Sequence, residues 1–159
     1  MPSPDPQPSD LDLAMMRRAL DLARTAAALH EVPVGAVVYR TATGEVLGEG
    51  FNRRELDNDP AAHAEMLAVR AAAMRLGDWR LNDCSLAVTL EPCPMCAGLI
   101  VNARVGRVLY GPADPKAGAT RTLFSIADDA RLNHRAVVVP GVLADEGASL
   151  LREFFRARR

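Results

Sequence analysis

The sequence predicts an α/β domain whose mixed β-sheet is covered by helices on both faces. Apolar, β-branched runs alternate with helical segments after an initial hairpin, and this order is typical of such folds. The chain has 159 residues, of which 49% are hydrophobic and 25% charged, which fits one globular domain with a substantial core. We expect the proline-rich residues 1–8 to form a disordered arm and residues 9–159 to form the domain.

The first part of the domain is predicted to form a helix followed by a hairpin. Ser9 is a suitable N-cap, and apolar residues follow it at helical spacing. Next, the runs at 34–40 and 45–51 have the β-branched and apolar composition of strands. Gly44 lies between them, where a tight turn is needed.

The remaining elements alternate between helix and strand. The alanine-rich segment 61–77 predicts a helix that ends at Gly77, because glycine is favoured just after the last helical turn. Further along, the pattern predicts a strand at 84–90, a helix at 93–103, strands at 106–111 and 134–140, and a closing helix at 145–159.

Charge and terminal composition exclude several classes of protein. Nineteen basic and 20 acidic residues give a formal charge of −1, so no global field draws the protein to nucleic acid or to a membrane. The N-terminus lacks the basic and apolar regions of a secretory signal, and no apolar run approaches the about 20 residues of a membrane span. We therefore expect a cytoplasmic protein with no membrane partner.

Two of the three cysteines, Cys93 and Cys96, lie three residues apart in TLEPCPMCAG. In a reducing cytosol this spacing favours a metal site or a redox pair over a disulfide. Pro92 suits the first position of a helix, which would place both thiols on one face of its first turn. The positive end of the helix favours thiolates. We expect the third cysteine, Cys84, to be a core side chain.

A third metal ligand is expected from His63 in AAHAEM, at the start of the second helix, rather than from His30 or His134. Glu65 follows two residues later, and on the wall of a helix the two side chains would point about 200° apart. They can share a site only off the end of the helix. The sequence therefore predicts that two helix N-termini meet at one ion.

Together, the His-x-Glu and Pro-Cys-x-x-Cys elements match the signature of zinc deaminases that act on nucleobases. A catalytic zinc ion takes three protein ligands and leaves a fourth position for water, whose pKa it lowers towards about 7. Hydroxide would then attack an amidine carbon while Glu65 carries the proton and ammonia leaves. The alternative is that Glu65 is a fourth ligand that closes a structural site.

Several longer stretches resemble the bacterial tRNA-specific adenosine deaminase family, among them EVPVGAVV, DPAAHAEM, RLNDCSLAVTLEPCPMCAG and GRVLYGPADPKAGA. The resemblance covers nearly the whole chain from about residue 11. It implies a three-layer α-β-α cytidine deaminase-like fold with a mixed five-stranded sheet, one Zn²⁺ per subunit, and a homodimer. The implied reaction converts the wobble adenosine of a tRNA anticodon, typically of an arginine tRNA, to inosine.

The resemblance also implies roles for particular residues. It assigns zinc binding to His63, Cys93 and Cys96, proton transfer to Glu65, contact with the target nucleoside to Asn52, and contact with the flanking anticodon nucleotides to Asp114 and Lys116.

Four arginines at the C-terminus could contact RNA phosphates: Arg152, Arg156, Arg158 and Arg159. A solvated basic face is the alternative. We expect the apolar side chains between them to dock the closing helix; these are Leu150, Leu151, Phe154 and Phe155.

Two other functions remain open from the sequence, a deaminase of a free base or nucleoside such as guanine or cytosine, and a structural zinc-binding module. The chain has only seven aromatic residues and so lacks an extended stacking platform for single strands, which favours a small shaped pocket for a splayed loop. Structural zinc normally takes four protein ligands, and only three are predicted here.

Overall fold

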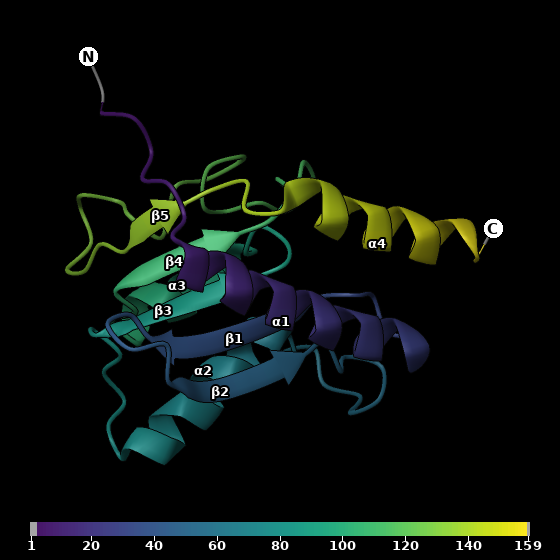
Figure 1. Ribbon diagram of the computed structural model, residues 1–159, viewed down its shortest axis with the longest axis horizontal. Coiled ribbons are helices and arrows are strands. Elements are labelled where there is room, and N and C mark those ends of the chain that lie inside the picture. The colour runs from purple at the N-terminus through teal and green to yellow at the C-terminus, as the bar shows by residue number, and fades with distance from the viewer. Residues whose placement is uncertain (1–2, 159) are drawn as a thin grey trace.

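A five-stranded sheet forms the centre of the computed structural model, which describes residues 3–158 (Figure 1). The strand order is β2-β1-β3-β4-β5, in which β1 is antiparallel to both β2 and β3, whereas β3, β4 and β5 are parallel. The predicted mixed sheet is thus confirmed. Its strands are β1 (Gly35–Arg40), β2 (Val46–Phe51), β3 (Cys84–Val88), β4 (Arg107–Tyr110) and β5 (Val137–Val139).

Helices cover both faces of this sheet. In Figure 1, α1 lies in front of the strands and α2 and α3 lie behind them, while α4 runs beside α1. The three-layer α-β-α arrangement is the one expected. The helices are α1 (Asp10–Ala28), α2 (Ala64–Leu76), α3 (Pro94–Asn102) and α4 (Ala144–Arg156).

The alternation of side chains along the strands builds two cores, one on each face. On β1, Val37 and Tyr39 pack with Met16 of α1, whereas Ala36 and Val38 belong to the larger cluster under α2 and α3. Because successive residues of a strand point to opposite faces, one apolar strand serves both cores. This explains why β1 reads as a continuous apolar run.

Close packing of α2 on β2 sets the position of the N-terminal end of α2 relative to the sheet. A Cβ atom at Gly48 would overlap the backbone of Ala68 and Ala72, and one at Gly50 would overlap that of Ala64. Glycine at these two strand positions therefore lets the helix lie directly on the sheet. The N-terminus of α2 is held near the end of β2 as a result.

The start of α1 is tied to the sheet by a buried polar network. Ser9 and Asp12 form a reciprocal capping box, as expected for an N-cap at Ser9. The buried Asp12 carboxylate also accepts hydrogen bonds from the Tyr39 hydroxyl (2.6 Å) and from both terminal nitrogens of Arg107 (3.0 and 2.8 Å). Burial alone would raise the pKa of Asp12, but the bonds from Arg107, Tyr39 and Ser9 outweigh it and lower that pKa.

The structure corrects some predicted element bounds. The strand predicted at 134–140 is limited to β5, because the polar side chains before it bind loops: His134 contacts the Val105 carbonyl (2.7 Å), and Arg135 donates to that of Asp128 (2.9 Å). The predicted turn at Gly44 and the helix end at Gly77 are confirmed by their positive φ angles of 78° and 66°.

Residues 3–8 have no regular secondary structure, and the boundary at residue 9 stays a prediction. Within the described part of the chain, no helix is both long enough and apolar enough to cross a membrane.

Candidate active site

His63 is the N-cap residue of α2 and has an extended backbone, with φ −77° and ψ 152°. Its side chain makes no capping hydrogen bond, so the imidazole is free to point off the end of the helix. Glu65 lies in the first turn of the same helix. The prediction that these two residues meet at a helix end rather than on a helix wall is confirmed.

Cys93 is the N-cap residue of α3, in an extended conformation with φ −76° and ψ 174°. The predicted helix start at Pro92 is wrong, because the first helical hydrogen bond joins the Ala97 N–H to the Cys93 carbonyl (2.8 Å) and Pro94 occupies the first turn. The carbonyl of Pro92 instead accepts a bond from the loop residue Ala119 (2.9 Å). Proline at the start of a helix suits Pro94 for the reason proposed for Pro92.

The two helix ends bring three side chains together as a group that could hold a metal ion. The Sγ atoms of Cys93 and Cys96 each lie 3.6 Å from Nδ1 of His63, and all three ligand atoms lie within 4.8 Å of one another. Zn–S bonds of about 2.3 Å and a Zn–N bond of about 2.0 Å at a tetrahedral angle separate S from N by roughly 3.5 Å, close to the observed distances. The group therefore fits a tetrahedral zinc ion with one position left over.

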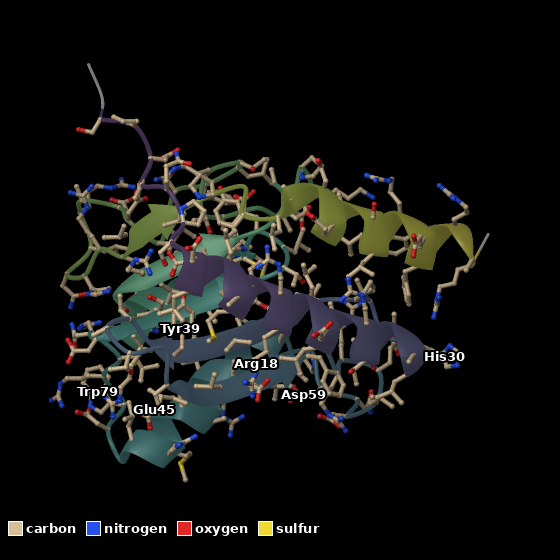
Figure 2. The ribbon with its side chains drawn as sticks, viewed as in Figure 1. Arg18, His30, Tyr39, Glu45, Asp59 and Trp79 are labelled. Atoms are coloured by element: carbon tan, nitrogen blue, oxygen red, sulfur yellow. The ribbon has the colours of Figure 1, made fainter. Side chains whose placement is uncertain are left out.

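The other candidate ligands lie elsewhere. His30 follows α1 and projects from its far end (Figure 2), and His134 is engaged with a loop carbonyl. Cys84 is buried at the start of β3 and burial raises the pKa of its thiol, as expected for a core side chain. Glu65 is not a member of the group, which favours the open catalytic site over the closed structural one.

The thiols are electrostatically distinct. Hydrogen bonding with Cys96, followed by contact with His63, lowers the pKa of Cys93 to about 4. Hydrogen bonding with Cys93 and burial act in the opposite direction on Cys96 and raise its pKa. The environment of Cys93 thus favours its thiolate, which is the form that binds a metal.

Glu65 is almost completely buried beside the metal group, with 4% of its surface exposed. Burial raises the pKa of its carboxyl. A carboxyl group with a raised pKa exchanges protons more readily near neutral pH, so this environment suits a proton carrier.

A pocket of about 180 Å³ opens above the metal group. Apolar side chains, including Val32, Val34 and Leu90, form part of its wall. Its polar lining comes from four separate segments of the chain: Asn52, Arg54, His63, Glu65, Glu91, Cys93 and Asp114.

Asn52, to which the family resemblance assigns contact with the target nucleoside, lines this pocket. Its Nδ2 donates to the Val32 carbonyl (3.2 Å), and its Oδ1 accepts from the Arg54 backbone N–H (3.1 Å). An amide has two donors and two acceptor sites, so one donor and one acceptor site remain for a ligand. Asn52 therefore both shapes the wall and presents a polar edge.

Asp114 and Lys116 lie at different depths. Asp114 lines the pocket, and its Oδ1 accepts hydrogen bonds from the backbone of Lys116 (2.9 Å) and Ala117 (3.3 Å). Lys116 lies outside the pocket, in an adjoining groove that shares Val32, Leu90 and Asp114 with it. The predicted pair is therefore split between the pocket and its rim.

The groove leads to α4 and its arginines. Lys116 lines it together with Leu151, Arg152 and Phe155, and a neighbouring hollow adds Arg156 and Arg158. The expectation that Phe155 docks the helix is wrong, because neighbouring helical residues point about 100° apart: Phe154 is buried and Phe155 is 50% exposed. Arg159 lies outside the described residues.

Two residues of the pocket, Arg54 and Glu91, were missed by sequence reasoning. The guanidinium of Arg54 has no hydrogen bond or ion pair with any residue between 3 and 158. Glu91 is buried and accepts several backbone hydrogen bonds. Its place in the Pro-Cys motif, as the one ionisable residue between a buried strand and the cysteines, was the available signal.

Comparison with known proteins extends this picture to the whole chain. The sequence model of the cytidine and deoxycytidylate deaminase zinc-binding region matches residues 9–112. The tRNA-specific adenosine deaminase of Haemophilus influenzae is 46% identical over 151 residues, which cover 95% of this chain and 87% of that protein.

Two solved structures share the fold. One, from a study of A-to-I editing by deaminases at the wobble position of transfer RNA, has a TM-score of 0.82 at 40% identity and covers 87% of this chain and 99% of its own. The guanine deaminase from Nitrosomonas europaea has a TM-score of 0.78 at 26% identity, covering 96% and 87%. Because the likeness spans the sheet and both helix ends that form the pocket, this chain is a zinc-dependent deaminase and belongs to the family that includes the bacterial tRNA-specific adenosine deaminases.

Proposed function

We propose that the protein deaminates the adenosine at the wobble position of a tRNA anticodon. The reaction is hydrolytic, converts adenosine to inosine and releases ammonia. The observation that carries this proposal is the continuity between the small metal-floored pocket and the groove lined by Lys116, Arg152 and Phe155. A free base needs only the pocket. A nucleotide within an RNA loop also needs a surface for its neighbours. The similarity to the Haemophilus influenzae enzyme and to the wobble-position deaminase structure supports the same substrate.

In this proposal His63, Cys93 and Cys96 would hold the zinc ion, which would supply a nucleophilic water at neutral pH. Glu65 takes a proton from the attacking water and delivers it to N1 of the adenine ring. Glu65 then takes the proton of the newly added hydroxyl group and passes it to the departing amine as the C6–N bond breaks, so that water and adenosine give inosine and ammonia. Its buried position between the metal group and the pocket supports this role.

The pocket wall would orient the nucleoside. The remaining donor and acceptor of Asn52 suit a base or ribose edge, and the Asp114 carboxylate suits a 2′-hydroxyl. The guanidinium of Arg54, which has no hydrogen-bond or ion-pair partner among residues 3–158, and the ammonium of Lys116 on the rim suit phosphates.

The groove would take the nucleotides outside the pocket. Phe155 presents an exposed aromatic face there, on which a base could stack. Arg152, Arg156 and Arg158 carry no ion pair with acidic residues of the described chain, and Arg158 lies over the ring of Phe154 at 3.4 Å. These cations are available to RNA phosphates.

Three finer points belong to the same proposal. An arginine tRNA as substrate comes from the family resemblance, and a cytoplasmic location is where a tRNA substrate would be met. A homodimer is supported by exposed apolar side chains on α3 and on the loop that follows Thr122, namely Met95, Leu123 and Phe124. Sedimentation velocity would test the dimer.

A second candidate is a deaminase of a free purine base. The likeness to the guanine deaminase supports it, since the same fold and a similar chain length serve a small substrate there. In that case the groove would contribute nothing to turnover.

The test is to measure kcat/KM of the zinc-loaded enzyme for an anticodon stem-loop and for free adenosine, guanine and cytosine. We expect the stem-loop to be strongly preferred, because contacts with the neighbouring nucleotides hold the target carbon in place and so raise kcat as well as lowering KM. Asp114→Ala and Lys116→Ala should impair the stem-loop reaction and barely change any residual reaction of free adenosine. A wild-type preference for a free base would overturn the proposal.

A further inference from the structure

The carboxylate of Glu91 is 2% exposed and lies between the metal group and the segment 112–122, called here the rim loop. Its Oε1 accepts from the Asp114 N–H (3.0 Å) and from the Thr122 hydroxyl. Its Oε2 accepts from the backbone N–H groups of Thr120 (3.1 Å), Arg121 (2.9 Å) and Thr122 (3.0 Å). One buried side chain thus binds both ends of the loop.

Backbone contacts join the same two segments. The Glu91 N–H donates to the Pro112 carbonyl (3.0 Å), and the Ala119 N–H donates to the Pro92 carbonyl (2.9 Å). Gly118 allows the loop to come this close, since a Cβ atom there would overlap the Glu91 carboxylate. The rim loop is therefore built around Glu91 rather than merely passing near it.

The position of Glu91 in the chain gives this arrangement its consequence. Cys93, a member of the metal group, follows two residues later, and Asp114 on the rim loop lines the pocket. The distance from the metal group to Asp114 therefore depends on the bonds that Glu91 makes.

We infer that Glu91 is a positioning residue for substrate recognition: it holds the rim loop at the distance from the metal group at which Asp114 and Lys116 meet the nucleotides flanking the target adenosine. The inference rests on the proposed function. In this role Glu91 acts through the loop to which its two oxygens are bonded, and not on the reacting atoms.

A carboxylate suits this task better than an amide. Four backbone N–H groups and one hydroxyl converge on its two oxygens, and an ionised carboxylate only accepts hydrogen bonds. Glutamine has the same shape but only one acceptor oxygen, and its NH₂ group would face donors in either orientation. Glu91→Gln therefore tests the hydrogen bonds at nearly constant volume.

For the zinc-loaded Glu91→Gln variant, we expect unchanged zinc content and a fall of about 10- to 100-fold in kcat/KM for the anticodon stem-loop, the scale of a misplaced binding group. KM should rise and kcat should fall together. A variant that had merely lost part of its folded enzyme would lower kcat at an unchanged KM. Hydrogen exchange should be faster at the amides of Asp114, Thr120, Arg121 and Thr122.

Glu31→Gln provides a matched control. Glu31 is also buried, but it binds a different loop through one bond, from the Leu56 N–H to its Oε1 (2.6 Å). Glutamine retains an acceptor for that bond. Exchange of the rim-loop amides should therefore remain at the wild-type rate in this variant.

Thr122→Val keeps the inference testable if Glu91→Gln does not fold. It removes only the hydroxyl donor and should raise KM about tenfold, the scale of one hydrogen bond to a charged group. Thr122→Ser restores the donor and should restore KM.

The role of Glu91 would be overturned if Glu91→Gln had the same KM, kcat and rim-loop exchange rates as the wild-type enzyme. If only Thr122→Val folds, an unchanged KM in that variant would overturn it. Failure of the wild-type enzyme to deaminate the stem-loop is a different result, because it would overturn the proposed function itself.

Discussion

The floor of the pocket and its rim are built in different ways. At the floor, His63, Cys93 and Cys96 come from the first residues of two helices that are packed on the sheet. The rim consists of loops, with Arg54 after β2 and Lys116 after β4, and of the exposed side of α4. Rigid elements hold the metal group, while in the proposed function loops and one helix face meet the substrate.

This difference indicates where substrate choice resides. The guanine deaminase and the wobble-position deaminase have high structural similarity to the same chain, with TM-scores of 0.78 and 0.82. A metal group and a proton carrier serve any cyclic amidine, so they do not select among substrates. We therefore expect changes at the floor to abolish chemistry and changes at the rim to alter specificity.

The largest effect is expected at Glu65. Glu65→Gln keeps the shape of the side chain but removes the proton carrier, so turnover should fall by about 10²- to 10⁴-fold. Zinc content, measured by metal analysis, should remain one ion per chain. Cys96→Ser is the contrasting variant and should lose the metal as well. If Glu65→Gln also loses zinc, Glu65 is a ligand and the floor is a structural site.

A smaller effect is expected from the arginines of α4. Changing Arg152, Arg156 and Arg158 together to alanine should weaken tRNA binding about 10- to 100-fold at low salt and reduce the salt dependence of binding, because fewer counterions are released. Zinc content should not change. Fluorescence anisotropy at several salt concentrations would measure both the tRNA affinity and its salt dependence.

The control for that variant changes three arginines that already form ion pairs, Arg18 with Glu49, Arg24 with Asp21 and Arg131 with Asp129. It removes the same charge and should leave affinity nearly unchanged. Equal losses of tRNA affinity in the two triple variants would show that binding depends only on net charge. In that case the α4 arginines would make no specific contact with RNA.

Arg54 and Arg53 offer a sharper comparison, because they are adjacent in the chain. Arg54 lines the pocket, whereas Arg53 is paired with Asp57 (3.0 Å) and lies over the ring of Phe51. Arg54→Ala should raise KM for the stem-loop about tenfold, the scale of one charge-assisted contact. Arg53→Ala should change it less than about twofold. Equal effects would exclude a specific phosphate contact at Arg54.

The smallest effect on turnover is expected from Asp12, whose network lies on the opposite face of the sheet from α2 and α3. Its folded-state pKa is lowered, so its contribution to stability is fully present above the unfolded pKa of about 3.9 and is lost as the pH falls below it. Asp12→Asn should lower the free energy of unfolding by about 3 kcal/mol at pH 7, since it leaves Arg107 without its charged partner.

Urea unfolding of wild type and Asp12→Asn between pH 7 and pH 3 would measure this difference. Acid also releases zinc, but it does so in both proteins, so the difference between them isolates Asp12. We expect the difference to shrink below about pH 4, and a difference that is constant with pH would contradict the assignment.

Much of the fold and of the pocket floor could be predicted from the sequence because the signals are local. The cap at Ser9, the helix end at Gly77 and the pairing of His63 with Glu65 each depend on a few consecutive residues. The start of α3 was harder to predict, because Pro92 and Pro94 both suit the first position of a helix. In the structure the Pro92 carbonyl accepts a hydrogen bond from the distant Ala119, and Pro94 lies in the first turn.

The rim was harder to predict because its residues are defined by contacts between distant segments. In the sequence, Glu91 is not distinguished from other polar residues, and its role depends on contacts with the distant rim loop. Phe155 has the composition of a core residue, but the packing of α4 leaves it exposed. Likewise, nothing local distinguishes Arg54 from Arg53.

By itself, the sequence determined which elements form and which side chains can bind a metal, since hydrophobic period, capping and ligand spacing act over a few residues. Only the tertiary structure decided which of those side chains share a pocket. The strand order β2-β1-β3-β4-β5 brings Asn52, His63, Cys93 and Asp114 together although they are far apart in the chain. The physical reason is that sheet order and loop position depend on the packing of the whole core. No single segment of the sequence contains enough information to specify that packing.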